Sequence, residues 1–211
     1  MKAIISLLLG VITAGVTAKV ECAKNTSAVV PDGYTLVPFS MKGVIEPGGE
    51  VMEFNGTITD IFKQIQGIKP DFKWGDLQST TPRTGRRLSK RSKSHIDCNV
   101  PNVERSVRVR FLFAHDYLKL VHQSCEIGGG PRKCAVLYCE DQTTVWMCND
   151  NTDSISRDCA EIADYVLDLL GDLDCADRVN DTEFGEADAM LRGQEFDTDG
   201  FSVAVGNSGC N

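Results

Sequence analysis

Nine cysteines are the residues of this 211-residue sequence with the most specific chemistry. Such a density is unusual in a cytosolic enzyme and typical of exported proteins, in which cysteines oxidise to disulfides. Cys22 stands alone near the N-terminus. The other eight suit four disulfides, whereas nine would leave one thiol over. Their spacing does not choose among the 105 possible pairings. The eight are Cys98, Cys125, Cys134, Cys139, Cys148, Cys159, Cys175 and Cys210.

Two dibasic pairs, Arg86-Arg87 and Lys90-Arg91, form a second chemical signal. They lie in the polar stretch 79–95, which lacks apolar periodicity and is expected to be an exposed linker. The sequence Leu-Ser-Lys-Arg at 88–91 resembles the site of a kexin-type protease of the secretory pathway, which needs an extended, mobile substrate. We expect cleavage after Arg91; the alternative is a solvated basic linker.

The N-terminus predicts export. Lys2 precedes the apolar stretch 3–16, and Val16-Thr17-Ala18 has the residues of a signal-peptide cleavage site. The stretch is short for a membrane span, which needs about 20 residues. We therefore predict a signal peptide at 1–18 that is cut after Ala18, a propeptide at 19–91 and a mature, extracellular protein at 92–211. A kexin-type protease is the expected partner during secretion.

Charge divides the chain at the same place. Residues 1–91 carry 12 Lys and Arg against 8 Asp and Glu, whereas residues 92–211 carry 10 against 22. A mature protein with a net charge of −12 is a poor nucleic-acid ligand, since nucleic-acid binders are basic. We expect the propeptide, at +3 without its signal, to fold against the acidic part as a chaperone or an inhibitor.

Candidates for catalysis or metal binding are weak. His115 and His122 are seven residues apart on a predicted helix, beside Asp116, but a metal site needs more converging ligands. The sequence Glu195-x-Asp197-x-Asp199-Gly200 resembles half of a calcium loop and is better explained as a tight turn before a strand. We assign no catalytic residue, metal ligand or cofactor. Tyr138 and Trp146 are expected in the core of strands rather than on a sugar-binding surface.

Three asparagines begin N-x-Ser/Thr sequences and are glycosylation candidates. They are Asn25, Asn55 and Asn180.

The pattern of the chain predicts a small α+β fold. In the propeptide, 34–40 and 51–58 have strand character, and Ile58, Ile61, Phe62 and Ile65 recur at helical spacing. We expect this region to form a small separate α+β unit. In the mature part we predict helices over 105–123 and from Asp158 to near Gly171, a hairpin of 133–139 with 143–148, and a last strand over 201–205.

The mature part resembles the virally encoded killer toxin of smut fungi, killer protein four, and its fungal relatives. The resemblance rests on Cys134-x4-Cys139-x8-Cys148, on DSISRDC ending at Cys159 and the helix AEIADYVLDLL after it, and on Leu-Asp-Cys175, Arg192-Gly193-Gln194 and FSVAVGNSGC ending at Cys210. Upstream, His-Ile-Asp-Cys98 resembles the mature N-terminus of the family. The resemblance implies an antiparallel sheet with two antiparallel helices on one face. It also implies the pairs Cys98–Cys175, Cys125–Cys159, Cys134–Cys139 and Cys148–Cys210.

The chain departs from this family in two ways that concern function. The family toxin is basic and blocks calcium channels with an exposed lysine, where this sequence has Leu137. An acidic protein is repelled by the acidic mouth of a channel, which makes a calcium-channel target doubtful. We therefore expect a secreted toxin or virulence effector that binds a surface target on a host plant or a competing fungus. The alternatives are an extracellular enzyme and a cell-wall carbohydrate-binding protein.

Overall fold

The computed structural model describes residues 29–79, 93–177 and 189–210, which form three α-helices and mostly antiparallel strands. This α+β architecture, braced by four disulfides, is the predicted fold class. We call residues 29–79 the N-terminal segment and the described residues of 93–210 the C-terminal part. The N-terminal segment holds β1 (Thr35–Leu36), β2 (Ser40–Val44), β3 (Met52–Asn55), α1 (Ile58–Ile68), the 3-10 turn η1 (Trp74–Asp76) and β4 (Gln78–Ser79).

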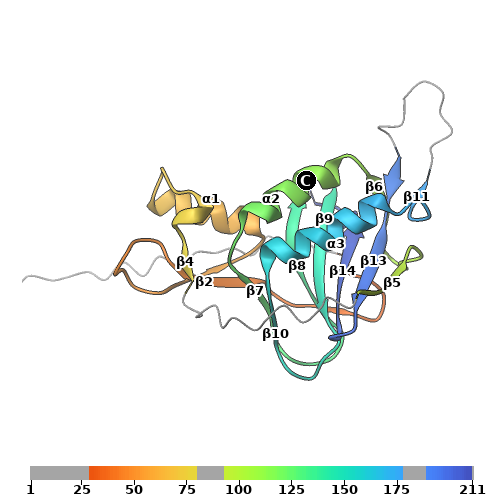
Figure 1. Cartoon of the computed structure of the whole chain (residues 1–211), viewed down its shortest axis with the longest axis horizontal. Coiled ribbons are helices and arrows are strands. Elements are labelled where there is room, and N and C mark those ends of the chain that lie inside the picture. The colour runs from red at the N-terminus through yellow and green to blue at the C-terminus, as the bar shows by residue number, and fades with distance from the viewer. Residues whose placement is uncertain (1–28, 80–92, 178–188, 211) are drawn as a thin grey trace, which may run out of the picture.

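The C-terminal part supplies the other two helices and the remaining strands (Figure 1). Its elements are β5 (Lys93–Asp97), β6 (Ser106–Val107), α2 (Arg110–Leu120), β7 (Ser124–Ile127), β8 (Lys133–Glu140), β9 (Thr143–Asn149), β10 (Ile155–Asp158), α3 (Cys159–Gly171), β11 (Ala176–Asp177), β12 (Met190–Leu191), β13 (Gly193–Asp197) and β14 (Phe201–Gly206).

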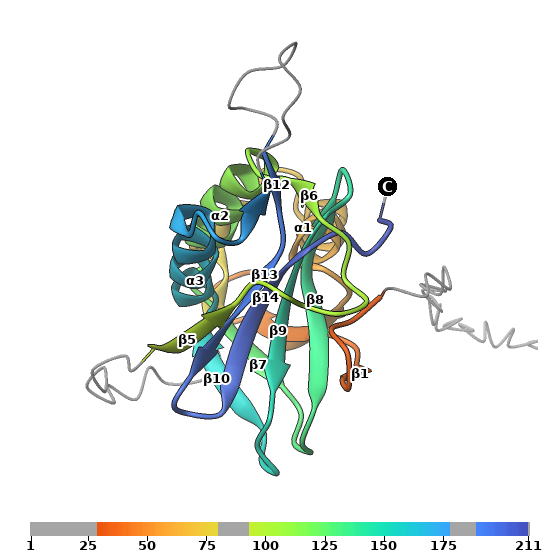
Figure 2. The same ribbon diagram turned by 90° about the vertical axis from the view of Figure 1, so that its right-hand side faces the viewer.

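The central sheet has the strand order β1-β8-β9-β14-β13-β5, and each neighbouring pair is antiparallel except β1 with β8. Helices α2 and α3 lie side by side on one face of this sheet (Figure 2). They run antiparallel, because the Cys159 amide donates to the Gln123 carbonyl at one end and the Arg108 guanidinium donates to the Leu170 carbonyl at the other. This is the helix-on-sheet arrangement that the family resemblance implies.

Local signals set the helix ends. Thr57 and Asp60 form a capping box at the start of α1, which ends at Ile68, shortly before Pro70. The Asp158 side chain accepts the Ala160 amide hydrogen at the start of α3, which ends at Gly171 as predicted.

The first helix of the C-terminal part is shorter than the predicted range of 105–123. Residues 106 and 107 instead form β6, which pairs with Leu191 and Met190 of β12. Val107 is β-branched, which weakens helix formation and favours strand pairing. Helix α2 ends at Leu120, so His122 lies beyond it and does not share a helical face with His115.

Two apolar clusters cover opposite faces of the central sheet, and side-chain alternation in β9 divides them. Val145 and Met147 face the helices, whereas Trp146 and Cys148 lie in a smaller cluster on the other face with Val103. Trp146 is fully buried, as expected for a core residue.

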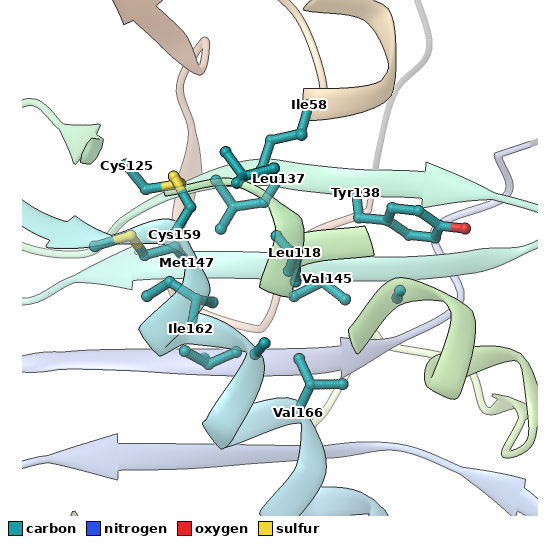
Figure 3. Packing of buried hydrophobic residues seen from close by; sticks show 14 of the residues in the cluster. Ile58, Leu118, Cys125, Leu137, Tyr138, Val145, Met147, Cys159, Ile162 and Val166 are labelled. Atoms are coloured by element: carbon teal, nitrogen blue, oxygen red, sulfur yellow. A yellow bond between two sulfur atoms is a disulfide. The ribbon is translucent and has the colours of Figure 1, made fainter. Parts of the chain in front are cut away.

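The N-terminal segment is not a separate unit, contrary to the sequence-based expectation. Its strand β1 extends the central sheet, and its strand β2 joins β7 in a second sheet of order β10-β7-β2-β3. Ile58, Ile61 and Ile65 of α1 are fully buried in the same cluster as the side chains of α2 and α3. Figure 3 shows Ile58 next to Leu137 of β8. An amphipathic helix must cover its apolar stripe, and this one uses the C-terminal part to do so.

A β-bulge in β8 shifts the pattern of the strand. Val136 pairs with Trp146 but Tyr138 pairs with Val145, so Leu137 is an extra residue. As a result Leu137 and Tyr138, although adjacent, both join the cluster on the helix face. Strand alternation alone would have sent them to opposite faces.

Candidate functional site

All eight cysteines of the C-terminal part are paired in disulfides. Cys98 is bound to Cys175 and Cys125 to Cys159, as the family resemblance implies. The first bond joins the end of β5 to the loop after α3. The second joins β7 to the start of α3. Cys22 lies outside the described residues.

The other two implied pairings are wrong: the structure joins Cys134 to Cys148 and Cys139 to Cys210. Cys134 and Cys139 lie five residues apart on the same strand, a separation of roughly 16 Å at about 3.3 Å per residue. A disulfide cannot span more than about 7 Å between Cα atoms. Cys148 instead lies directly across the hairpin from Cys134, with the Cα atoms 4.0 Å apart.

The dibasic pairs at 86–87 and 90–91 and the cut after Ala18 lie outside the described residues. The structure resumes at Lys93, two positions after the expected cut, and this residue is firmly held. Its ammonium group pairs with Asp168, lies 3.5 Å from Glu195 and stands 4.4 Å above the ring of Tyr165. Burial raises the pKa of Glu195, and the positive charge of Lys93 opposes that rise. Lys93 is therefore anchored to α3 and β13 at the start of β5.

The weak catalytic and metal candidates do not come together in the described residues. His115 pairs with Asp116 on α2, whereas His122 lies past the helix end. The carboxylates of 195–199 point to different partners: Asp197 accepts from Tyr165 at 2.6 Å and Asp199 pairs with Arg157 at 2.8 Å.

The 197–200 region is the tight turn that the sequence predicts. The Gly200 amide donates to the Asp197 carbonyl at 3.2 Å, and Gly200 has a φ of +74° that suits glycine. Strand β14 starts at the next residue.

Among the glycosylation candidates, only Asn55 is described. It is exposed at the end of β3, in the N-terminal segment. Asn25 and Asn180 lie outside the described residues.

Five aromatic rings connect the N-terminal segment to the C-terminal part. The ring of Phe62 in α1 lies 6.2 Å from that of Tyr117 in α2, and the ring of Trp74 lies 6.4 Å from it, both edge-on. Phe72 packs on Phe62 and Trp74, while Tyr117 continues to Tyr138 of β8 at 6.1 Å. Edge-to-face contacts of this kind add to the burial of apolar area.

Next to this aromatic cluster is an open groove of about 540 Å³ between α2 and the tip of the β8–β9 hairpin. Its apolar side chains are Phe113, Tyr117 and Leu120, on one face of α2, and Tyr138. Phe113 is 68% exposed and Leu120 59%. The polar lining residues are Arg110, Asp116, Glu140, Asp141 and Thr143. Large apolar side chains gathered in a concave surface are typical of binding sites rather than of ordinary surface.

Burial raises the pKa of both tyrosines of this groove to about 12. The carboxylate of Glu140 acts in the same direction on each, because a phenolate would be repelled by it. Both hydroxyls are therefore neutral hydrogen-bonding groups throughout the physiological pH range.

The hairpin tip beside the groove is strained. Asp141 and Gln142 have φ values of +48° and +61°, in the left-handed region that favours glycine or asparagine. Two long-range hydrogen bonds hold this turn: Arg110 donates to the Asp141 carbonyl at 2.6 Å, and the Gln142 amide donates to the Cys210 carbonyl at 2.9 Å. Strain held in place by surrounding contacts is common at functional sites.

Leu137, which the sequence resemblance places where the killer toxin has its lysine, is fully buried. It lies in the cluster shared with Ile58 rather than on the surface (Figure 3). The position therefore offers no exposed group in this chain.

The groove was not predicted from the sequence. The spacing of Phe113, Tyr117 and Leu120 marks a second apolar face on α2 and was the available signal. The first apolar face of this helix, formed by Phe111, Ala114 and Leu118, is the one that is buried in the core.

No family model, curated protein or solved structure matches this chain. In the described ranges, no helix is long and apolar enough to cross a membrane. Four disulfides are typical of a protein that folds in an oxidising compartment.

Proposed function

We propose that the protein is a secreted, killer-toxin-like effector, cut at Lys90-Arg91, that acts on host-plant or competing fungal cells by binding a surface target. The observation that carries this proposal is the groove formed by Phe113, Tyr117, Leu120 and Tyr138 on a disulfide-braced scaffold. A protein that must act outside its own cell needs a rigid fold and an exposed recognition surface, and this chain combines the two features.

The lining of the groove suits a protein target. Aromatic side chains provide apolar contact area at low entropic cost and are enriched at the centres of protein interfaces. The acidic residues Asp116, Glu140 and Asp141 at the same site would favour a target surface that presents basic residues beside an apolar group.

The rival functions have less support. A cationic channel plug has no counterpart here, because Leu137 is buried and the mature part is acidic. A carbohydrate-binding role for Trp146 is disfavoured because this residue is fully buried. For an enzyme, the described carboxyl group with a perturbed pKa is Glu195, and this buried carboxylate is engaged by the partly exposed Lys93.

The experiment is a toxicity and leaf-response assay with the protein secreted by its own host. Phe113→Glu is expected to abolish the effect because it puts a charge at the centre of the apolar surface. Leu173→Glu is the matched control, because Leu173 is 66% exposed and lies outside the groove. Both variants should keep the circular dichroism spectrum of the parent.

The proposal is wrong if Phe113→Glu retains full activity on cells that respond to the parent protein. It is equally wrong if the two variants lose activity to the same extent. Intact-mass measurement of the secreted protein tests the processing: a species that begins at Ser92 and gains eight daltons on reduction indicates the cut and four disulfides.

A further inference from the structure

We infer that the N-terminal segment stays bound after the cut at Lys90-Arg91, so that the working protein is a complex of two chains without a covalent link. The inference rests on the cleavage proposed above and concerns what cleavage leaves behind. A propeptide that covers a preformed protein can leave it, whereas a segment that completes the core and the sheet cannot leave without exposing both.

Backbone pairing is the first argument. The amides of Thr35 and Val37 donate to the carbonyls of Arg132 and Cys134, both at 2.8 Å, so β1 covers the start of the outer edge of β8, at Lys133 and Cys134. Without β1 this part of the edge would present unpaired polar groups, which can pair with another chain and lead to aggregation. The N-terminal segment thus protects the start of this edge of the central sheet.

Burial is the second argument. Ile58, Ile61 and Ile65 are fully buried, and the side chains of Phe72 and Trp74 are almost so. These residues share one cluster with Leu118, Leu137 and the other side chains of the helix face. Inside this contact the side-chain amide of Gln123 donates to the backbone carbonyl of Leu77 at 2.6 Å. Loss of the segment would leave this buried donor without its partner.

The segment also reaches the opposite face of the sheet. Tyr34 packs on the cluster around Trp146, and its hydroxyl donates to Asp150 at 3.0 Å. Nearby, Asn102 donates to Asp32, also at 3.0 Å. The N-terminal segment therefore contacts both faces of the central sheet and the edge between them. Contacts on three sides favour slow dissociation.

Charge does not hold the complex together. The described N-terminal segment carries four lysines against seven acidic residues, a net of −3, so it is acidic like its partner. The positive charge expected to draw the propeptide to the acidic part lies in the linker at 83–91. The contact is apolar, and high salt should therefore not separate the chains.

A disulfide cannot provide the link. The eight cysteines of the C-terminal part are paired with one another, which leaves none for Cys22.

The retained chain also supports the groove, because Phe62 and Trp74 pack on Tyr117, and Lys63 lies 3.7 Å from Glu140. The two-chain form is accordingly the one with the complete binding surface.

The test begins with uncut protein, purified from a host that lacks the protease and treated with a purified kexin-type protease. Denaturing gels report the cut, while size-exclusion chromatography and native mass spectrometry at about 10 μM report association, a concentration at which even a micromolar complex persists. We expect two bands on the denaturing gel and one native mass that contains both chains. Size-exclusion chromatography should give one peak in low salt and also in 1 M NaCl, where the screening length is only about 3 Å. Separate elution of the C-terminal chain would overturn the inference.

A second variant separates this inference from the cleavage proposal. A site for an unrelated, sequence-specific protease replaces Arg86–Arg91, so that the chain can be cut even if the kexin-type enzyme ignores it. Failure of the natural site alone then counts against the proposed processing, whereas separation of the chains after the engineered cut counts against the two-chain complex.

The strength of the contact is tested with Ile61→Ala in the engineered-site protein. Deleting buried methyl groups should raise the dissociation constant of the cut protein by about a hundred-fold. The uncut variant should stay assembled, because the linker keeps the segment at an effective concentration of about a millimolar. Leu173→Ala is the control and should leave the dissociation constant unchanged; an equal constant for Ile61→Ala would overturn the inference.

Discussion

Because one core spans both parts of the chain, a substitution in α1 should destabilise residues far from it in sequence. Ile61 is fully buried among side chains from both parts, and truncation to alanine removes its contacts and leaves a cavity. Isoleucine-to-alanine changes in cores cost roughly 2–5 kcal/mol, and we expect about 3 kcal/mol here. With a urea dependence of about 2–3 kcal/mol per molar, the unfolding midpoint should fall by about 1 M.

The two tryptophans allow a sharp assay. Trp74 belongs to the N-terminal segment and Trp146 to the central sheet, so the background variant Trp74→Phe leaves a fluorescence signal from the sheet alone. In this background, Ile61→Ala should lower the urea midpoint of the Trp146 fluorescence transition by the same amount of about 1 M. The urea dependence of the unfolding free energy should not change. Leu173→Ala, at a 66% exposed position, is the control and should not shift it.

An unshifted Trp146 transition would refute the reasoning. It would mean that the N-terminal segment unfolds by itself and that the sheet does not depend on it. A second transition at lower urea, seen by circular dichroism and not by Trp146, would lead to the same conclusion.

Three further results are expected. Non-reducing peptide mapping should recover a Cys134–Cys148 peptide, and replacing both cysteines by alanine should cost about 3 kcal/mol in urea unfolding, as expected for a loop of this length. Gln142→Gly should raise the unfolding free energy by up to about 1 kcal/mol, since glycine relieves the positive φ of the hairpin tip; a lower value would show that the turn is not strained. Tyr117 and Tyr138 have folded pKa values of about 12 against an unfolded value near 10. Their contribution is therefore complete below pH 10 and is lost as the pH rises to 12, by about 1 kcal/mol each after allowing for solvent screening at the groove. Unfolding at a series of pH values should show that fall, and Tyr138→Phe should reduce it.

Much of the secondary structure follows from local sequence. The spacing of Ile58, Ile61 and Ile65 predicts α1, which ends shortly before Pro70, and the structure adds the Thr57 cap at its start. Asp158 and Gly171 delimit α3 in the same way. These signals act within one or two turns of chain, so they survive whatever the rest of the molecule does.

The candidate site was less accessible from the sequence. The apolar face of α2 that enters the core was recognisable from its spacing, but the groove depends on a second face of that helix meeting a hairpin tip some 20 residues further along the chain. Helix α2 begins later than the predicted residue 105 because Ser106 and Val107 pair with β12, a contact between distant segments.

The α+β character, the helical spacing behind α1, the places where α3 begins and ends, the even set of eight cysteines downstream of Lys90-Arg91 and the expectation of export all follow from the sequence alone. The tertiary structure decided three things: which cysteines meet, that the N-terminal segment shares the core, and where the exposed aromatic residues form a groove. The physical reason is the same in each case. A cap or an apolar stripe acts between neighbours in the chain. By contrast, the extra residue at Leu137 changes the face of the sheet to which the later residues of β8 point. Likewise, the partners that bury Ile61 depend on shape and apolar area across the whole molecule.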